Sequence, residues 1–219
     1  LSSSARGVLE ALDSIFESIA KEANSIAGGA ISTQRLTSVG GFIFQAQFDP
    51  ADWSGDLIPY PVTLVGSDDI SIGDVDSAPW TAATQLDAKT PSTRKIYVGK
   101  SNPVSVTANE FVWASLDDDA KEALRAPPGA PVGTPLDAES VGQARLNFLR
   151  GDRSQEAPDG TLRKRGHVLG DIVNSGVAYS GAPSLRIADA DYVSGFATTY
   201  ASRVKTLFVG ANDGMLHAF

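Results

Sequence analysis

The sequence predicts a mainly β fold with several helices, an α+β protein in appearance, preceded by an amphipathic helix. Three patterns support this prediction: apolar residues at three- and four-residue spacing over residues 5–27, two-residue alternation from residue 42, and two apolar runs around a Gly-containing turn at the C-terminus. With 219 residues, of which 42% are apolar and 20% charged, the chain can bury a core as one or two domains.

The first predicted element is an amphipathic helix over residues 5–27. Its apolar face consists of Val8, Leu9, Leu12, Ile15, Phe16, Ile19, Ala23 and Ile26. Gly28-Gly29 follows and is expected to end the helix. Such a face is typical of core packing, and a coiled-coil or partner surface is the alternative. We therefore assign residues 1–40 to this helix and a connector.

Residues 41–166 are predicted to form a β-rich segment with inserted helices and loops. The alternation over residues 42–48 and the apolar run over residues 57–65 predict two strands joined by a turn. Pro59 and Pro61 confine part of the second strand to a sheet edge, because proline cannot donate to a neighbouring strand.

The next stretch is predicted to contain more loop than strand. Residues 66–92 are acidic and loop-like, with Trp80 and Leu86 as the expected anchors. Short apolar runs at residues 95–99 and 111–113 predict two further strands.

Two helices are predicted in the second half of this segment. The acidic residues 115–119 suit the positive N-terminal turn of a helix, and Asp137 is the expected N-cap of a second helix that ends near Leu149. The Pro- and Gly-rich residues 126–135 between them predict a surface loop. Residues 150–166 are polar.

The C-terminal residues predict a β-hairpin. Residues 204–209 and 215–219 have strand character, and residues 211–214 predict a tight turn because Asn, Asp and Gly tolerate left-handed backbone. A two-stranded hairpin is marginal alone, and its free edge invites further pairing. Since the chain stops there and starts at Leu1 without a signal peptide, we expect it to be a piece of a longer protein.

Composition excludes several classes of function. A net charge of −8 argues against a nucleic-acid surface, and the absence of cysteine excludes a disulfide scaffold and a thiolate metal site. The only histidines are His167, expected to be solvated, and His217, expected to be packed and hydrogen-bonded within a strand. With no defensible Ser/His/Asp order and no phosphate-binding Gly-rich loop, we predict no catalytic residues.

Five blocks of the sequence, in order, resemble motifs of the PilC/PilY family of type IV pilus tip-associated adhesins. They are Phe44-Gln45-Ala46-Gln47-Phe48 with Trp53-Ser54-Gly55-Asp56-Leu57, then Trp80-Thr81-Ala82-Ala83 with Arg94-Lys95-Ile96-Tyr97, then Phe111-Val112-Trp113 with Leu149-Arg150-Gly151-Asp152 and Glu156, then Arg165 with Leu169-Gly170-Asp171-Ile172-Val173-Asn174-Ser175, and finally Val209-Gly210-Ala211-Asn212-Asp213-Gly214-Met215-Leu216-His217-Ala218-Phe219. The resemblance covers residues 42–219.

The resemblance implies a fold and a setting. It implies that the chain is an incomplete part of a modified β-propeller domain, with residues 41–166 before the propeller and residues 167–219 as its first, truncated strands. It implies an exported protein at the pilus tip, outer membrane or cell surface, reached through the periplasm, with roles in pilus biogenesis, adhesion, twitching motility and virulence. The implied partners are minor pilins, a host-cell or abiotic surface and the remainder of the parent chain, with no nucleic acid.

The family's Ca²⁺ loop has no match in this sequence. The acidic runs Asp74-Val75-Asp76, Asp117-Asp118-Asp119 and Asp189-Ala190-Asp191 lack the Gly at the sixth position and the Glu at the twelfth that such a loop needs. We interpret them as solvated loops and expect the Ca²⁺ site in another part of the propeller. No metal or other cofactor is predicted within this chain.

The tripeptide Arg150-Gly151-Asp152 is the one candidate binding motif, since it matches the integrin-recognition tripeptide. In the alternative interpretation, Gly151 ends the preceding helix and Arg150 and Asp152 cap and pair locally. Asp171 and Asn174 are expected to satisfy loop backbone, and the tryptophans Trp53, Trp80 and Trp113 are expected to anchor the core.

We predict a non-enzymatic type IV pilus assembly and tip adhesion protein that acts by protein–protein and surface recognition. Two alternatives are a quinoprotein-like propeller dehydrogenase, whose blades open with similar hairpins, and a purely structural connector.

Overall fold

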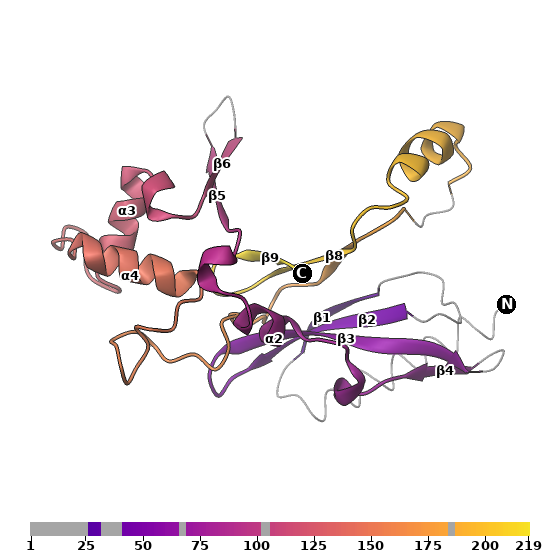
Figure 1. Cartoon of the computed structure of the whole chain (residues 1–219), viewed down its shortest axis with the longest axis horizontal. Helices are drawn as coiled ribbons and strands as arrows, with labels where there is room; N and C mark the ends of the chain where they lie inside the picture. Colours follow the sequence, from indigo (N-terminus) through magenta and orange to yellow (C-terminus); the bar gives the residue numbers. More distant parts are fainter. Residues whose placement is uncertain (1–25, 32–40, 66–68, 102–105, 184–186) are drawn as a thin grey trace. The chain divides into compact units, whose positions relative to one another are not determined.

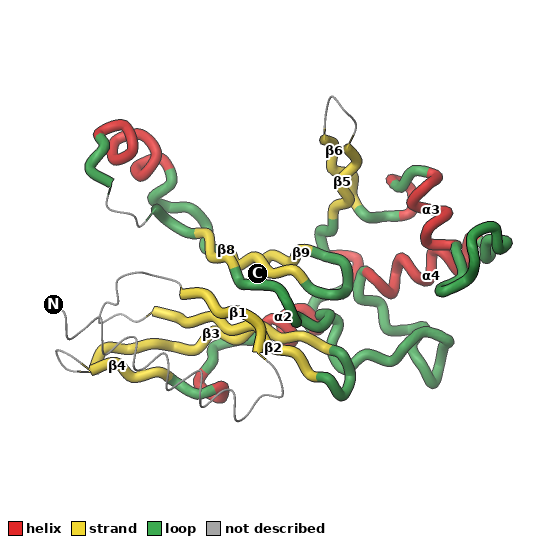
Figure 2. Tube along the Cα trace, turned by 180° about the vertical axis from the view of Figure 1, so that it is seen from behind, coloured by secondary structure: helices red, strands yellow, loops and turns green. Residues whose placement is uncertain are grey.

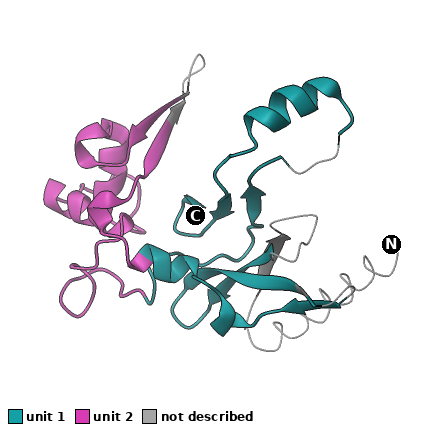
Figure 3. Ribbon diagram, turned by 45° about the vertical axis from the view of Figure 1, so that its right-hand side comes forward, with its two compact units in different colours: residues 1–86, 166–219 teal, residues 87–165 magenta. Residues whose placement is uncertain are grey.

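The computed structural model describes residues 26–31, 41–65, 69–101, 106–183 and 187–219 (Figure 1). The chain divides into two compact units, one of residues 1–86 with 166–219 and one of residues 87–165 (Figure 3). The predicted division at residues 40 and 166 stays a prediction. Most of the predicted N-terminal helix lies outside the described residues.

The first unit contains a four-stranded antiparallel sheet in the order β1 (Ile26–Ile31), β2 (Gly41–Asp49), β3 (Ser54–Val65) and β4 (Asp69–Ile72). Figure 2 shows these strands running side by side. The prediction that a helix extends to residue 27 and ends at Gly28-Gly29 is wrong, because these residues belong to β1. Strands β2 and β3 confirm the two predicted strands.

The register of β2 and β3 explains the alternation in the sequence. Phe44 lies opposite Pro59 and Ala46 opposite Leu57, so these residues share one face of the sheet. Strand β4 pairs only with the stretch of β3 from Val62 onward, which leaves the proline-containing stretch without a partner strand on that side. This agrees with the predicted edge position of the prolines.

The same unit contains a three-stranded antiparallel sheet of β7 (Ala178–Ser180), β8 (Thr206–Gly210) and β9 (Leu216–Ala218). Strands β8 and β9 confirm the predicted C-terminal hairpin, whose turn places Gly214 at a φ of 81°. The connection between β7 and β8 carries a short π-helix, η4 (Tyr192–Ala197), which the sequence patterns did not predict.

One hydrophobic core joins the two sheets of this unit. Its buried members are Phe44, Ala46, Leu57, Ala82, Leu86, Val168, Leu169, Ile172, Leu207 and Val209. Helix α2 (Ala82–Asp87) supplies two of them, and Leu86 and Trp80 act as the predicted anchors. A 3-10 turn, η1 (Val75–Ser77), precedes this helix. Each fully buried Leu or Ile contributes about 1.5–3 kcal/mol of transfer free energy, so Leu169 and Ile172, which lie outside the strands, add substantially to this core.

The second unit combines a hairpin with two helices. Its elements are η2 (Pro91–Thr93), β5 (Tyr97–Ser101), β6 (Val106–Glu110), η3 (Trp113–Ser115), α3 (Asp118–Arg125) and α4 (Glu139–Leu149). Both helices confirm predictions.

Three local predictions in this unit are wrong. Strand β5 begins two residues later than the predicted strand at 95–99. Residues 111–113 lead into η3 instead of forming a strand, since β6 ends at Glu110. Ala138, not Asp137, is the N-cap of α4, because the Asp137 carboxylate binds Arg145 at 2.6 Å.

The described residues therefore form a mixed fold with antiparallel sheets and few helices, and the propeller assignment stays a prediction. No helix in the described part of the chain is both long and apolar enough to cross a membrane.

Candidate binding site at the end of helix α4

Arg150 ends α4 and directs its cation into the second unit. The side chain is buried, and its guanidinium donates hydrogen bonds to the carbonyl oxygens of Phe111 at 2.8 Å, Arg94 at 3.0 Å and Pro91 at 3.2 Å. A planar guanidinium with several fixed donors suits such convergence of carbonyls. Arg150 thus connects the C-terminus of α4 to the segments on either side of the β5–β6 hairpin.

Gly151 and Asp152 turn the chain away from the helix. Gly151 has a φ of 105°, a left-handed conformation that glycine adopts without a Cβ penalty. The half-buried Asp152 accepts a hydrogen bond from the Ser154 amide at 2.8 Å through its carboxylate, and its own amide donates to the Asn147 carbonyl at 2.9 Å. These contacts match the alternative interpretation, in which Gly151 ends the helix while Arg150 and Asp152 form local bonds. Adhesion through the tripeptide stays a prediction.

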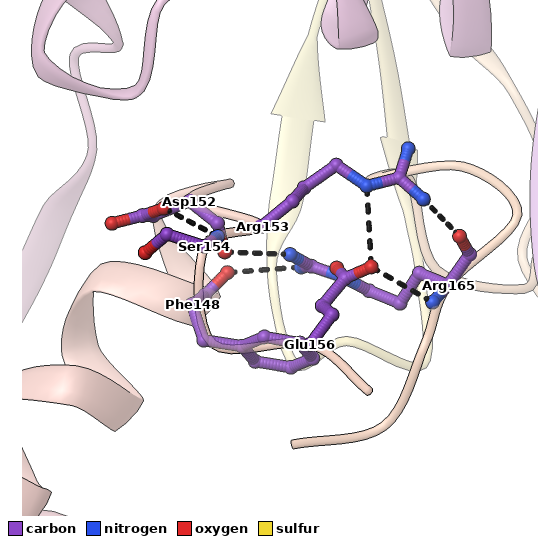
Figure 4. A network of polar contacts seen from close by, with 6 residues as sticks. All are labelled: Phe148, Asp152, Arg153, Ser154, Glu156 and Arg165. Atoms are coloured by element: carbon purple, nitrogen blue, oxygen red, sulfur yellow. Dashed lines mark hydrogen bonds and ion pairs between the residues drawn. The ribbon is translucent and has the colours of Figure 1, made fainter. Parts of the chain in front are cut away.

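A buried ion pair fixes the loop that follows (Figure 4). Arg165 Nε lies 2.7 Å from Glu156 Oε1, and both side chains are less than a tenth exposed. The same guanidinium donates to the carbonyl of Phe148 at 2.9 Å and to that of Asp152 at 3.2 Å. It also lies over the Phe148 ring, 3.6 Å from the centroid.

Arg153 completes this network from the exposed side. Its Nε lies 3.2 Å from Glu156 Oε2, and its guanidinium donates to the Arg165 carbonyl. Burial acts to raise the pKa of Glu156, but hydrogen bonds and the charge of Arg165 outweigh it and hold that pKa below its ordinary value. The Glu156 carboxylate is therefore ionised. Its ion pair with Arg165 fixes a guanidinium that also binds the carbonyl of Asp152, the last residue of the candidate tripeptide.

Sequence reasoning did not identify this network. Glu156 and Arg165 both fall in blocks that resemble the family, yet no periodicity links two residues of an irregular loop. The one local signal is the spacing of three between Arg153 and Glu156, which also occurs by chance.

A second polar cluster lies in the first unit, at the β8–β9 turn. Asp213 accepts hydrogen bonds from the amides of Gly170 at 3.2 Å and Met215 at 3.1 Å, and its Oδ2 lies 2.8 Å from His217 Nε2. The buried His217 is thus packed and hydrogen-bonded, which confirms that prediction. The half-buried His167 has polar or electrostatic partners of its own.

Asp171 and Asn212 extend this cluster. Asn212 Nδ2 donates to Asp171 Oδ2 at 2.6 Å, and the Asn212 amide donates to the Asp171 carbonyl at 2.9 Å. The Gly210 amide donates to Ser175 Oγ at 3.0 Å. The last two family-like blocks are therefore bound to each other. The Asp171 carboxylate binds the side-chain amide of Asn212, where the prediction had it bind loop backbone. Asn174 is exposed.

The interpretation of the three acidic runs as loops is wrong, because each run begins a helix or helical turn. Asp74, Asp117 and Asp189 accept hydrogen bonds from the amides of Ser77, Ala120 and Tyr192 at 2.8–2.9 Å, as N-terminal caps do. No group of three metal-binding side chains forms among the described residues.

The tryptophans differ from one another. Trp80 packs against the core of the first unit, as expected. Trp113 is half-buried and donates from Nε1 to Glu139 at 2.8 Å. Trp53 is 57% exposed and has a φ of 56°, so the prediction that it anchors the core is wrong.

Comparison with known proteins gives the relatives of this chain. The type IV pilus biogenesis factor PilY1 homolog of Xylella fastidiosa (strain Temecula1) is 31% identical over 227 residues, which cover 100% of this chain and 16% of that protein. The type IV pilus biogenesis factor PilY1 of Pseudomonas aeruginosa strain PAK is 36% identical over 187 residues, 81% of this chain and 15% of that protein. The PilY1 of strain PAO1 is 35% identical over the same lengths.

No protein-family model matches the chain, and no solved structure matches it at a significant level. The chain spans 15–16% of the length of these curated relatives. Identity of 31–36% over most of the chain confirms the resemblance drawn from the sequence blocks. The chain belongs to the PilY1 family.

Proposed function

We propose that the chain is part of a non-enzymatic protein of type IV pilus assembly and tip adhesion, which acts by recognising pilins and surfaces at the outside of the cell. The single observation that supports this proposal is similarity to proteins named type IV pilus biogenesis factor PilY1 over 81–100% of the chain.

The test is a strain that lacks the gene encoding this chain. Surface pili are counted by electron microscopy, and attachment to cells and abiotic surfaces is measured in parallel. Loss of pili supports a role in assembly, and normal pili with lost attachment support adhesion. Unchanged pili and attachment would overturn the proposal and direct attention to quinone-dependent dehydrogenase activity of the full-length protein.

Complementation separates the contribution of the tripeptide. Asp152→Ala in the full-length protein removes the acidic group, and Asp159→Ala removes an exposed carboxylate from the same loop as a matched control. We expect adhesion through the tripeptide to be lost with the first variant only. Equal attachment with both variants would assign recognition to another surface.

A further inference from the structure

Strands β5 and β6 form a two-stranded sheet, and no third strand pairs with either of them in the part of the chain that the structure describes. Figures 1 and 2 show this hairpin extending away from α3 and α4, the helices of its unit. The edge of a sheet carries a row of main-chain donors and acceptors that can pair with another extended chain. The two edges of this hairpin differ, and the β5 edge is the one suited to pairing.

Arg150 holds both ends of the hairpin in place. Its guanidinium binds the carbonyl of Arg94, before β5, at 3.0 Å and that of Phe111, after β6, at 2.8 Å. The Phe111 amide donates to the Ile96 carbonyl at 2.8 Å, which closes the same end of the hairpin. Since an isolated two-stranded hairpin is marginally stable in water, this anchoring orders the β5 edge before a partner binds and so lowers the entropy cost of binding.

The bond between Phe111 and Ile96 also defines which main-chain groups of β5 point outward. In an antiparallel ladder, hydrogen-bonded residue pairs alternate with pairs whose N–H and C=O groups point away from the partner strand. Ile96 belongs to a bonded pair, so Tyr97 and Gly99, one and three residues further along, belong to pairs of the second kind. The amides and carbonyls of Tyr97 and Gly99 therefore point to the open side of β5.

The β6 edge is less suited to pairing. The residues opposite Tyr97 and Gly99 are Glu110 and Ala108. The Glu110 carbonyl already accepts a hydrogen bond from the Val112 amide at 2.8 Å, which interrupts the outward row of β6 at its end. Glu110 is exposed and adds a negative charge beside this edge. Residues 94–101, in contrast, contain three cationic residues and no acidic residue, so the two edges differ in charge as well.

The exposed face of β5 defines the kind of segment that fits beside it. Lys95, Tyr97 and Gly99 are exposed, whereas Ile96 and Val98 between them are half-buried. Tyr97 is 61% exposed, and a Cβ built at Gly99 meets nothing within 4 Å. A neighbouring strand can therefore place a large side chain over Gly99, next to Tyr97 on the same face. Lys95 offers a cation to a carboxylate at the other end of this face.

We propose that the β5 edge binds an extended segment of another protein, which adds a third strand to the hairpin. The segment carries a large apolar side chain that packs over Gly99 and a carboxylate that pairs with Lys95. Main-chain hydrogen bonds to Tyr97 and Gly99 supply affinity, and the two side chains supply selectivity. The site rests on the recognition function proposed above, since a protein that acts by recognition needs a partner in trans.

Titration of the purified chain with a synthetic peptide tests this proposal. The capped peptide Glu-Thr-Val-Thr-Trp-Thr-Val-Thr-Glu places its indole over Gly99 and one glutamate opposite Lys95 in either strand direction. Hydrogen exchange is followed by NMR. We expect the amides of Tyr97 and Gly99 to exchange rapidly in the free chain and about tenfold or more slowly with bound peptide, whereas the Val98 amide, which points toward β6, exchanges slowly in both.

Proline variants separate the two edges. Gly99→Pro removes an N–H that points outward, so the hairpin keeps its own bonds while peptide binding should weaken about tenfold or more. Ala108→Pro removes the matching N–H from the β6 edge and should leave binding unchanged. Lys95→Glu should weaken binding of the glutamate peptide and strengthen binding of the same peptide with lysine in place of both glutamates.

The exchange measurement uses the wild-type chain, so its outcome does not depend on whether the proline variants fold. Unchanged exchange of Tyr97 and Gly99 at saturating peptide would overturn the proposal. So would slow exchange of both amides in a free chain that dimerises, because a second copy would then occupy the edge. Equal binding by the two proline variants, with wild-type amide spectra, would also overturn it. Loss of pili in the deletion strain together with a peptide that does not bind would keep the pilus function and discard the β5 site.

Discussion

Glu156 and Arg165 form an ion pair at 2.7 Å that water barely reaches, and the same Arg165 binds main-chain carbonyls at the end of α4. Desolvation of two charges is costly, so such a pair is favourable only when further hydrogen bonds satisfy both groups. Here Arg153 and the Arg165 amide supply those bonds to Glu156. The pair therefore specifies the path of residues 150–165.

Truncating one partner should destabilise the second unit strongly. Glu156→Ala leaves the Arg165 charge buried without its carboxylate, at an expected cost of about 3–5 kcal/mol in the free energy of unfolding. Denaturant titration followed by circular dichroism measures this change. Arg153→Ala is the matched control: its side chain is 41% exposed, and its loss should cost at most about 1 kcal/mol. Equal effects would contradict the buried pair.

Asp213 makes the stability of the hairpin sensitive to acid. Burial acts to raise its pKa, but the hydrogen bond and charge of His217 outweigh burial and lower it. A carboxyl with a lowered folded pKa contributes stability above its ordinary pKa and loses it as the pH falls through the folded value. The stability difference between the wild type and Asp213→Asn should therefore shrink at pH values below its ordinary pKa of 3.8. A stability difference that stays constant with pH would rule out a lowered pKa of Asp213 in the folded chain.

Gly170 leaves room for the β8–β9 turn. A Cβ at this position would lie 2.8 Å from both the amide nitrogen and the Cβ of Asp213. Gly170→Ala should therefore destabilise the chain by about 1–3 kcal/mol. Gly176→Ala is the control, because a Cβ there meets nothing within 4 Å. Similar melting temperatures for the two variants would show that the turn tolerates the extra atom.

The Asp56 carboxylate, which belongs to strand β3, caps the first turn of helix α2. Burial raises its pKa, although its Oδ1 accepts a hydrogen bond from the Ala83 amide at 2.8 Å. A carboxyl with a raised folded pKa favours folding below its unfolded pKa, and this advantage is lost as the pH rises through the folded value. Asp56→Asn, which keeps the acceptor, should reduce this pH dependence, whereas Asp56→Ala should also cost about 0.5–2 kcal/mol through loss of the cap. Identical pH profiles of the free energy of unfolding for the wild type and Asp56→Asn would refute a raised pKa of Asp56 in the folded chain.

Arg150 requires its guanidinium, not only its charge. Arg150→Lys keeps the cation but cannot bind three carbonyls in one plane, so we expect destabilisation of about 1–3 kcal/mol. Thermal unfolding of this variant beside Lys121→Arg, a change on an element away from these carbonyls, provides the comparison. Wild-type stability in Arg150→Lys would show that the carbonyl contacts are dispensable.

Local patterns predicted the elements whose own residues determine them. Strand β2 alternates, β3 contains an apolar run, α3 begins at the acidic cap Asp117, and the β8–β9 turn uses Gly214 in a conformation that glycine favours. Helix α2 was missed because the carboxylate that binds its first turn comes from Asp56 on β3. Asp137 was assigned to the wrong role because Arg145, two turns along α4, binds it instead.

The candidate site was less predictable than the fold. A tripeptide shows which groups are present but not where they point, and the burial of Arg150 depends on carbonyls of Pro91, Arg94 and Phe111. The Glu156–Arg165 pair likewise depends on the path of an irregular loop.

The first unit is discontinuous along the chain, and this affects how it is made. Phe44 and Leu57 belong to a core that also includes Leu169 and Ile172, which follow the entire second unit along the chain. During synthesis from the N-terminus, the core contributed by β2, β3 and α2 lacks its later members until the ribosome has completed residues 87–165. The second unit consists of contiguous residues, so all of its own contacts become available before the first unit is complete.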